Sequence, residues 1–96
     1  MIKIEIKKDQ IIINGHSGYS VSGSDIVCAS VSSIAITSIN AILRIDENSI
    51  NYKQEDGFLE INILKHTDII DSLIENMIDL LSELEKQYKN FVKIYK

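Results

Sequence analysis

Residues 15–32 read GHSGYSVSGSDIVCASVS, and the rest of the chain is organised around this stretch. It contains the only cysteine, Cys28, one of the two histidines, His16, and three of the four glycines. The small and polar composition of residues 17–23 predicts a loop, and Ser24 is a good N-cap for the helix that follows. We therefore expect a strand end that carries His16, then a loop, then a helix with Cys28 in its first turns.

Before this stretch, isoleucines at positions 2, 4 and 6 alternate with charged residues. This period of two is typical of a strand with one buried face. Residues 11–16 predict a second strand, and residues 8–10 predict the turn between the two. The N-terminal part is thus expected to form a β-hairpin.

A helix is predicted from Ser24 to Arg44 or Ile45, because Ser24 is a good N-cap and no glycine or proline occurs from Ser24 to Asp56. Its many β-branched residues have a low helix propensity, which the N-cap and the lack of breakers override. Isoleucines alternate with alanines and serines, so this helix is apolar around most of its circumference. Such a helix must be buried on more than one side, against a sheet and against either another helix or a second subunit.

Residues 49–54 and 58–64 predict two further strands around a turn at residues 55–57, because Asp-Gly is a strong hairpin signal. Thr67 or Asp68 begins a second helix, which has one apolar stripe and charged residues on its other face. The stripe consists of Ile70, Leu73, Ile74, Met77, Leu81, Leu84 and Tyr88.

A short strand at residues 91–95 completes the order ββαββαβ. This order predicts a single α+β domain over residues 1–96, with a mainly antiparallel sheet and two helices packed on it. A chain of this length buries a modest fraction of its surface on folding, and oligomerisation would add to its stability.

The composition excludes several classes of function. The formal net charge of −4 argues against a nucleic-acid binder, which usually has a basic face. One cysteine cannot form an internal disulfide, and a lone thiol with a candidate histidine is typical of an intracellular protein. We find no signal-peptide pattern in the first residues and expect no run long and apolar enough to span a membrane. The sequence therefore predicts a cytoplasmic protein without a membrane partner.

The pair of Cys28 and His16 suits nucleophilic catalysis, in which the thiolate is the reacting form. The positive end of a helix favours a thiolate by about 0.3–1 kcal/mol, which is too little without a base. His16 lies 12 residues before Cys28 and can reach it if the loop folds back. Backbone N–H groups at the helix start could bind a developing oxyanion.

Two roles are open to Asp25. Its i, i+3 spacing places it on the same side of the helix as Cys28, where its charge disfavours a thiolate. As the third member of a triad, it would instead orient His16 and stabilise the imidazolium. We favour the second role, because repulsion between partly solvated charges is modest and a misdirected base removes the proton path.

Less specific interpretations also stay open from the pattern alone. A lone cysteine on an apolar helix is most often an inert core residue, and Asp25 also suits a helix start without any catalytic role. One cysteine with His16 and His66 in different segments supplies too few ligands for a metal site. No Lys-Ser/Thr pair follows Gly18 and Gly23, so a phosphate loop is not predicted. We expect no cofactor.

The segments GHS at 15–17, GSDIVCA at 23–29 and VS at 31–32 together resemble the signature of the ribosomal-processing cysteine protease family. Chain length and the order of elements agree with that family over essentially the whole chain. Ser17 stands where the family usually has alanine, and Ser30 stands where it usually has a small apolar residue. Neither departure affects the reacting groups.

The resemblance implies an α+β homodimer with Cys28 as nucleophile and His16 as general base. It also implies a substrate, the N-terminal extension of a large-subunit ribosomal protein (number twenty-seven), cut after a short apolar motif that contains aromatic residues. The loop at residues 17–23 would then order over the substrate. The expected substrate contacts are Tyr19, Val21, Gly23 and Ser24.

Two other function classes stay open. One is a non-catalytic module for ribosome assembly or peptide binding, and the other is a thiol-dependent hydrolase of a small molecule. The combination of His16 and Cys28 favours catalysis over binding alone.

Overall fold

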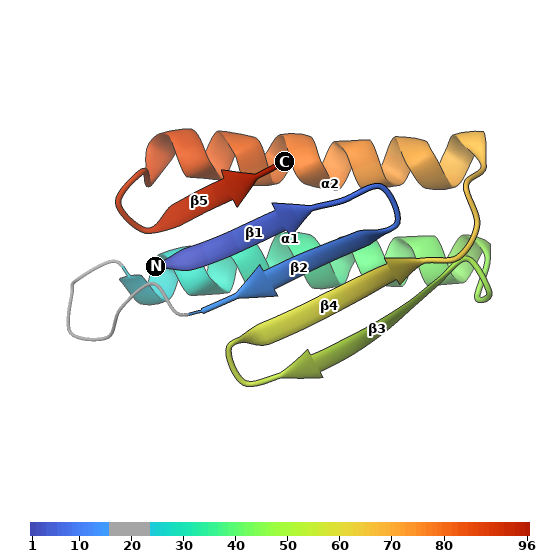
Figure 1. Ribbon diagram of the computed structural model, residues 1–96, viewed down its shortest axis with the longest axis horizontal. Coiled ribbons are helices and arrows are strands. Elements are labelled where there is room, and N and C mark those ends of the chain that lie inside the picture. Colours follow the sequence, from blue (N-terminus) through green and yellow to red (C-terminus); the bar gives the residue numbers. More distant parts are fainter. Residues whose placement is uncertain (16–23) are drawn as a thin grey trace.

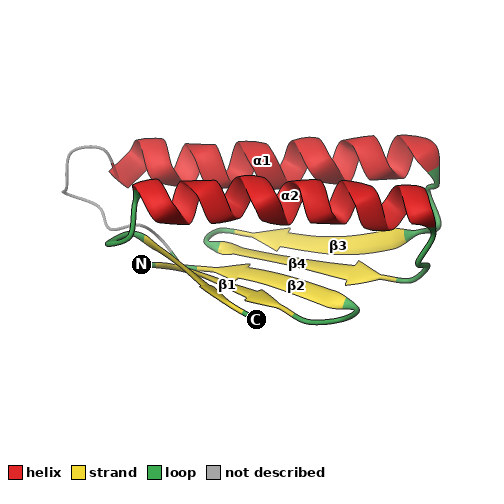
Figure 2. Cartoon of the chain, turned by 90° about the horizontal axis from the view of Figure 1, so that it is seen from above, coloured by secondary structure: helices red, strands yellow, loops and turns green. Residues whose placement is uncertain are grey.

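The computed structural model describes residues 1–15 and 24–96, which form a five-stranded sheet with two helices on one of its faces (Figures 1 and 2). In chain order the elements are β1 (Ile2–Ile6), β2 (Gln10–Asn14), α1 (Ser24–Ile45), β3 (Ile50–Glu55), β4 (Phe58–Ile63), α2 (Asp68–Gln87) and β5 (Val92–Tyr95). The predicted α+β fold with the order ββαββαβ is confirmed.

The strand order in the sheet is β3-β4-β2-β1-β5. The first three neighbouring pairs are antiparallel, and β1 pairs with β5 in parallel. The sheet is therefore mixed but mainly antiparallel. β5 reaches its place beside β1 because α2 carries the chain back along the helix-covered face (Figure 1).

The ends of β2 differ from the prediction. The strand starts at Gln10, which was predicted as a turn residue, because Gln10 pairs with Asn62 of β4 and its side-chain amide donates to the Asn62 side chain at 3.0 Å. It ends at Asn14, two residues earlier than predicted. Gly15 has a φ of +105°, which lies outside the β region and turns the chain away from the sheet.

β1 has the predicted bounds, and the other three strands differ from the prediction by one residue at one or both ends. β3 begins after Ser49, because the Ser49 hydroxyl and N–H both donate to the carbonyl of Asp46 in the turn that follows α1. β4 ends one residue early at Ile63, and β5 begins one residue late at Val92. Thr67 is the N-cap of α2, and its hydroxyl accepts a hydrogen bond from the backbone N–H three residues later.

The hydrophobic core lies between the sheet and the helices. α1 buries one face at a spacing of three or four residues, and α2 buries five of the seven residues predicted for its stripe. The buried residues of the helices are Val27, Val31, Ala35, Ile39, Ile42, Ile70, Ile74, Met77, Leu81 and Leu84. Leu73 and Tyr88 are only partly buried. As predicted, α1 packs against both the sheet and a second helix.

The expectation that no segment is long and apolar enough to span a membrane is wrong for α1. Its segment Ile26–Ile45 spans 20 residues with a mean hydropathy of 2.0, so it is long and apolar enough to cross a membrane by length and composition alone. A core helix of a soluble protein has the same property. In this fold the apolar side of the segment packs on the sheet and on α2.

The β1–β2 turn, which is distant in the sequence, meets the start of α2 at His66, in the connection between β4 and α2. The Nε2 atom of His66 lies 2.6 Å from a carboxylate oxygen of Asp9, in the β1–β2 turn, and Nδ1 lies 2.8 Å from a carboxylate oxygen of Asp71, in the first turns of α2. These two hydrogen bonds, first that to Asp9 and then that to Asp71, raise the pKa of His66 above its ordinary value of 6.5. The imidazolium, with both ring N–H groups donating, therefore joins the sheet to α2.

We expect His66→Asn to destabilise the protein more at pH 5.5 than at pH 9. A group whose pKa is raised on folding contributes stability that is fully present below its unfolded pKa of about 6.5 and is lost as the pH rises through the folded value. Urea denaturation of both proteins at both pH values measures the difference. Ser72→Ala, on the exposed side of α2, is the control, and an equal effect of His66→Asn at both pH values would contradict the assignment.

Candidate active site

Cys28 lies four residues after the start of α1. Its side chain is half-buried, and it is not in a disulfide. The neighbouring positions Val27 and Val31 are buried in the core, so Cys28 stands where the buried face of the helix meets its surface. This position lets a thiol be held by packing while it remains in reach of a ligand.

Cys28 lines a pocket of about 230 Å³ between the first half of α1 and the β3–β4 hairpin. The surface of the pocket is of mixed polarity, and the lining residues are Ile2, Ile13, Gly15, Cys28, Val31, Ser32, Ala35, Ile36, Gln54, Glu55, Asp56, Gly57, Phe58 and Leu59. For comparison, an apolar cavity of about 150 Å³ can hold benzene. The pocket is therefore large enough for one apolar side chain beside the thiol.

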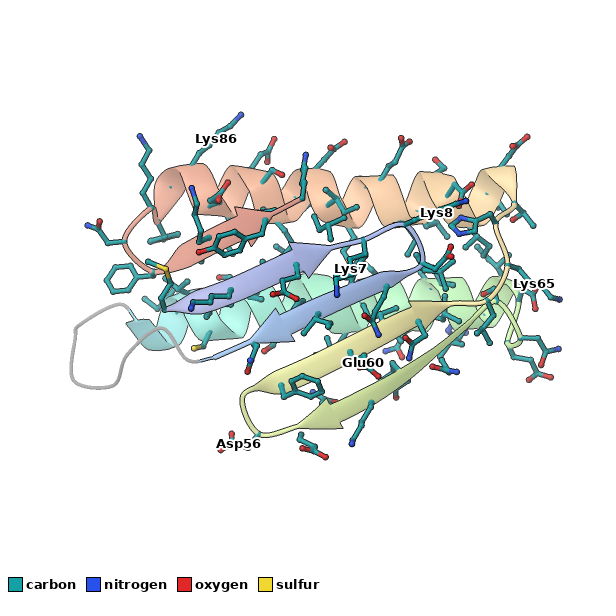
Figure 3. The ribbon with its side chains drawn as sticks, in the orientation of Figure 1. Lys7, Lys8, Asp56, Glu60, Lys65 and Lys86 are labelled. Carbon is teal, nitrogen blue, oxygen red and sulfur yellow. The ribbon has the colours of Figure 1, made fainter. Side chains whose placement is uncertain are left out.

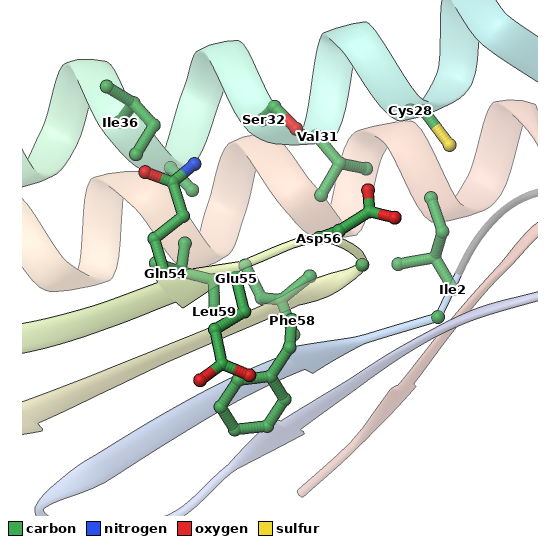
Figure 4. A pocket seen from close by; sticks show the side chains of 14 residues that line it. Ile2, Cys28, Val31, Ser32, Ile36, Gln54, Glu55, Asp56, Phe58 and Leu59 are labelled. Carbon is green, nitrogen blue, oxygen red and sulfur yellow. The ribbon is translucent and has the colours of Figure 1, made fainter.

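The side chains around the pocket point to different sides of the sheet. Figure 4 shows the Asp56 carboxylate extending from the hairpin turn toward α1, on the side of Cys28. The side chains of Glu55 and Phe58 point away from α1 (Figure 4), as expected for residues that are paired with each other across the hairpin. Asp56 is thus the charged side chain that faces the pocket in the part of the chain that is described.

The hairpin turn is fixed to the end of β2. Glu55 pairs with Phe58, so the turn itself is Asp56-Gly57, in which Gly57 has a φ of +69°. The N–H of Gly15 donates to the carbonyl of Gly57 at 2.8 Å. A Cβ atom at Gly15 would lie 2.5 Å from the Met1 carbonyl oxygen, so only glycine allows β2 to end this close to the start of β1.

Comparison with known proteins identifies the family. Residues 1–93 match the sequence profile of the family described as "Cysteine protease Prp". The chain belongs to this family of cysteine proteases. It is 28% identical over 93 residues to the "Ribosomal processing cysteine protease Prp" of Staphylococcus aureus, covering 94% of this chain and 88% of that protein. As a Prp-family protein, the chain is a cysteine peptidase.

Solved structures of S. aureus Prp have the same fold. The structure of that protease in complex with a substrate peptide has a TM-score of 0.84 and 22% identity, covering 98% of this chain and 95% of that one. The structure with a covalently linked product peptide has a TM-score of 0.82 and 23% identity, covering 97% and 94%. The order of elements and the mixed five-stranded sheet are therefore those of Prp proteases.

Of the residues predicted from the sequence to form the site, Cys28 is placed in the pocket. His16, Tyr19, Val21 and Gly23 lie outside the described residues, as does the loop predicted to order over a substrate.

Ser24 and Asp25 begin α1 as predicted, but their side chains also lie outside the description. The second histidine, His66, belongs to the opposite end of the fold. Its neighbour Lys65 forms an ion pair at 3.3 Å with Asp46, just after the end of α1. Cys28 lies near the start of α1, which has 22 residues and is therefore about 33 Å long.

Sequence reasoning missed the wall of the pocket that the β3–β4 hairpin supplies. The turn at Asp56-Gly57 was recognised, but nothing in its pattern relates residue 56 to residue 28. Only the register of β2 against β4, which pairs Asn14 with Phe58, brings the hairpin turn to the same end of the sheet as the start of α1.

Proposed function

We propose that this Prp-family peptidase removes the N-terminal extension of a large-subunit ribosomal protein (number twenty-seven) during ribosome maturation. The observation that carries the proposal is the position of Cys28, the only cysteine of the chain, in a pocket of mixed polarity at a helix start. The name of the S. aureus relative, a ribosomal processing protease, supports the substrate class. With Ile2, Val31 and Ala35 among its lining residues, a pocket of this size can take one apolar side chain of an extension that is cut after an apolar, aromatic-containing motif.

In the proposed mechanism, His16 takes the proton of the Cys28 thiol, and the thiolate attacks the carbonyl carbon of the scissile bond. Backbone N–H groups at the start of α1 stabilise the oxyanion. The C–N bond breaks as the imidazolium gives its proton to the leaving amine, which leaves a thioester on Cys28. Water, deprotonated by His16, then hydrolyses the thioester and restores the thiol.

The remaining assignments belong to the same proposal. Tyr19, Val21, Gly23 and Ser24 contact the substrate, and Asp25 orients His16. The protein needs no metal or cofactor for this chemistry. It acts in the cytoplasm, because a lone thiol is typical of intracellular proteins and the proposed substrate is a ribosomal protein.

Cys28→Ala is expected to lower the turnover of a peptide spanning the extension junction by more than about four orders of magnitude. Because the side chain is half-buried and loses one atom, the change in unfolding free energy should be about 1 kcal/mol or less. Mass spectrometry of the cleaved peptide and urea denaturation measure the two effects, with Ser72→Ala as the control. Turnover by a folded Cys28→Ala protein would overturn the proposed nucleophile. Binding without cleavage by the wild-type protein would support a peptide-binding module instead.

Asp25→Asn is expected to lower turnover by about two to four orders of magnitude, because a misdirected imidazole cannot take the thiol proton. A pH titration of Cys28 alkylation in the same variant separates this effect from a change in thiol ionisation. Turnover should fall even if alkylation becomes faster. Wild-type turnover in Asp25→Asn would reduce the site to His16 and Cys28, with Asp25 serving only the start of the helix.

We also propose that the protein is a homodimer that pairs through the exposed face of α1. No charged residue occurs between Ile26 and Leu43, although Ile26 is 61% exposed and Ser33 and Thr37 are exposed as well. A helix face without charge is suited to burial against a second copy.

Thr37→Arg should therefore halve the mass measured by light scattering at micromolar concentration. The dimer would have to bury the unpaired charge of the arginine, so the protein should become a monomer. Asn76→Arg, at an exposed position of α2, should leave the mass unchanged. A monomeric wild-type protein under these conditions would show that the uncharged face of α1 has no partner copy.

A further inference from the structure

The turn of the β3–β4 hairpin brings a single carboxylate to the pocket. Asp56 lines the same pocket as Cys28, and its side chain extends toward α1 (Figure 4). Figure 3 places it at the tip of the hairpin, at the end of the sheet opposite Lys65. The acidic group thus lies at the mouth of the pocket, beside the position that a substrate residue near the scissile bond would occupy.

Its position is fixed by backbone contacts. The hairpin has a two-residue turn, which leaves no slack between the paired residues Glu55 and Phe58. The hydrogen bond between Gly15 and Gly57 ties this turn to the end of β2. A carboxylate on such a turn is held in place better than one on a long loop, so it can discriminate between substrates.

The charge of Asp56 is not balanced by the residues around it. The adjacent Glu55 pairs with Lys53 at 3.4 Å on the other face of the hairpin. No ion pair found in residues 1–15 and 26–96 includes Asp56, and none of the lining residues is basic. The described lining of the pocket therefore has apolar and uncharged polar groups, with one unbalanced negative charge, that of Asp56, facing it.

We propose that Asp56 is a specificity residue that favours a substrate with a basic side chain close to the scissile bond. This inference rests on the proposed peptidase site at Cys28 and adds to it a requirement on the charge of the substrate. A lysine or arginine next to the apolar residue in the pocket would pair with the Asp56 carboxylate, and a glutamate there would be repelled. The expected substrate is thus a segment in which an apolar stretch borders on basic residues.

Asp56→Asn removes the charge with little risk to the fold, because Asn-Gly is as favourable as Asp-Gly in a two-residue hairpin turn. Asp79→Asn, at an exposed position of α2, makes the same change in net charge away from the pocket. The substrates are peptides of one sequence that spans the extension junction. A Lys, Gln or Glu is placed in turn at each of three positions on either side of the scissile bond.

For at least one position we expect the wild-type kcat/KM to be about two- to fivefold higher with Lys than with Gln, as for an exposed ion pair. At the same position the kcat/KM with Glu should be lower than that with Gln. Asp56→Asn should bring these ratios to about one, and Asp79→Asn should keep them. The preference should weaken in 0.5 M salt, because the charges are exposed to solvent.

The same peptides bound to Cys28→Ala, followed by fluorescence anisotropy, separate this inference from the proposed function. A Lys preference in binding that disappears with the added Asp56→Asn substitution supports the role of Asp56 even if no peptide is cut by the wild type. Cleavage with equal ratios for Lys, Gln and Glu at all six positions would overturn the role of Asp56 and leave the peptidase intact. A preference that survives in Asp56→Asn would overturn it as well.

Discussion

The hydrogen bond from Gly15 to Gly57 joins two of the segments that line the pocket. It joins the end of β2 to the β3–β4 turn at 2.8 Å, and it is formed where Gly15 also passes close to the backbone of Met1. A side chain is not tolerated at residue 15, because φ is +105° and a Cβ atom would collide with the carbonyl oxygen of Met1. The direction in which the chain leaves the sheet toward residue 16 is therefore set by backbone geometry.

α1 serves the core and the pocket with the same side chains. Val31 and Ala35 are buried in the core, and they also line the pocket beside Cys28. A small residue at position 35 leaves space that a larger one would fill, and a larger residue in such a close-packed layer would also strain the sheet. Stability and access to the pocket are thus coupled through the first four turns of one helix.

Local patterns were sufficient for the elements but not for the site. The alternation at residues 2–6, the N-cap signal at Ser24 and the Asp-Gly turn each depend on neighbouring residues, and the corresponding elements were predicted to within two residues. The parallel pairing of β1 with β5 depends on residues about 90 positions apart, which no local pattern encodes. The same applies to the contact of His66 with Asp9, 57 positions away, and to the placement of Asp56 near Cys28. These features arise from the register of the sheet.

The parallel pairing also determines when the pocket is complete during synthesis. Ile2 lines the pocket, and its N–H donates to the carbonyl of Phe91 at 2.8 Å before β1 continues alongside β5. Until residues 91–95 have left the ribosome, β1 therefore has one unpaired edge, and Ile2 lacks the bond that fixes it. A nascent chain that already contains Cys28 thus still has an unfinished pocket wall. The order of synthesis therefore delays the assembly of a competent protease until β5 is available to pair with β1.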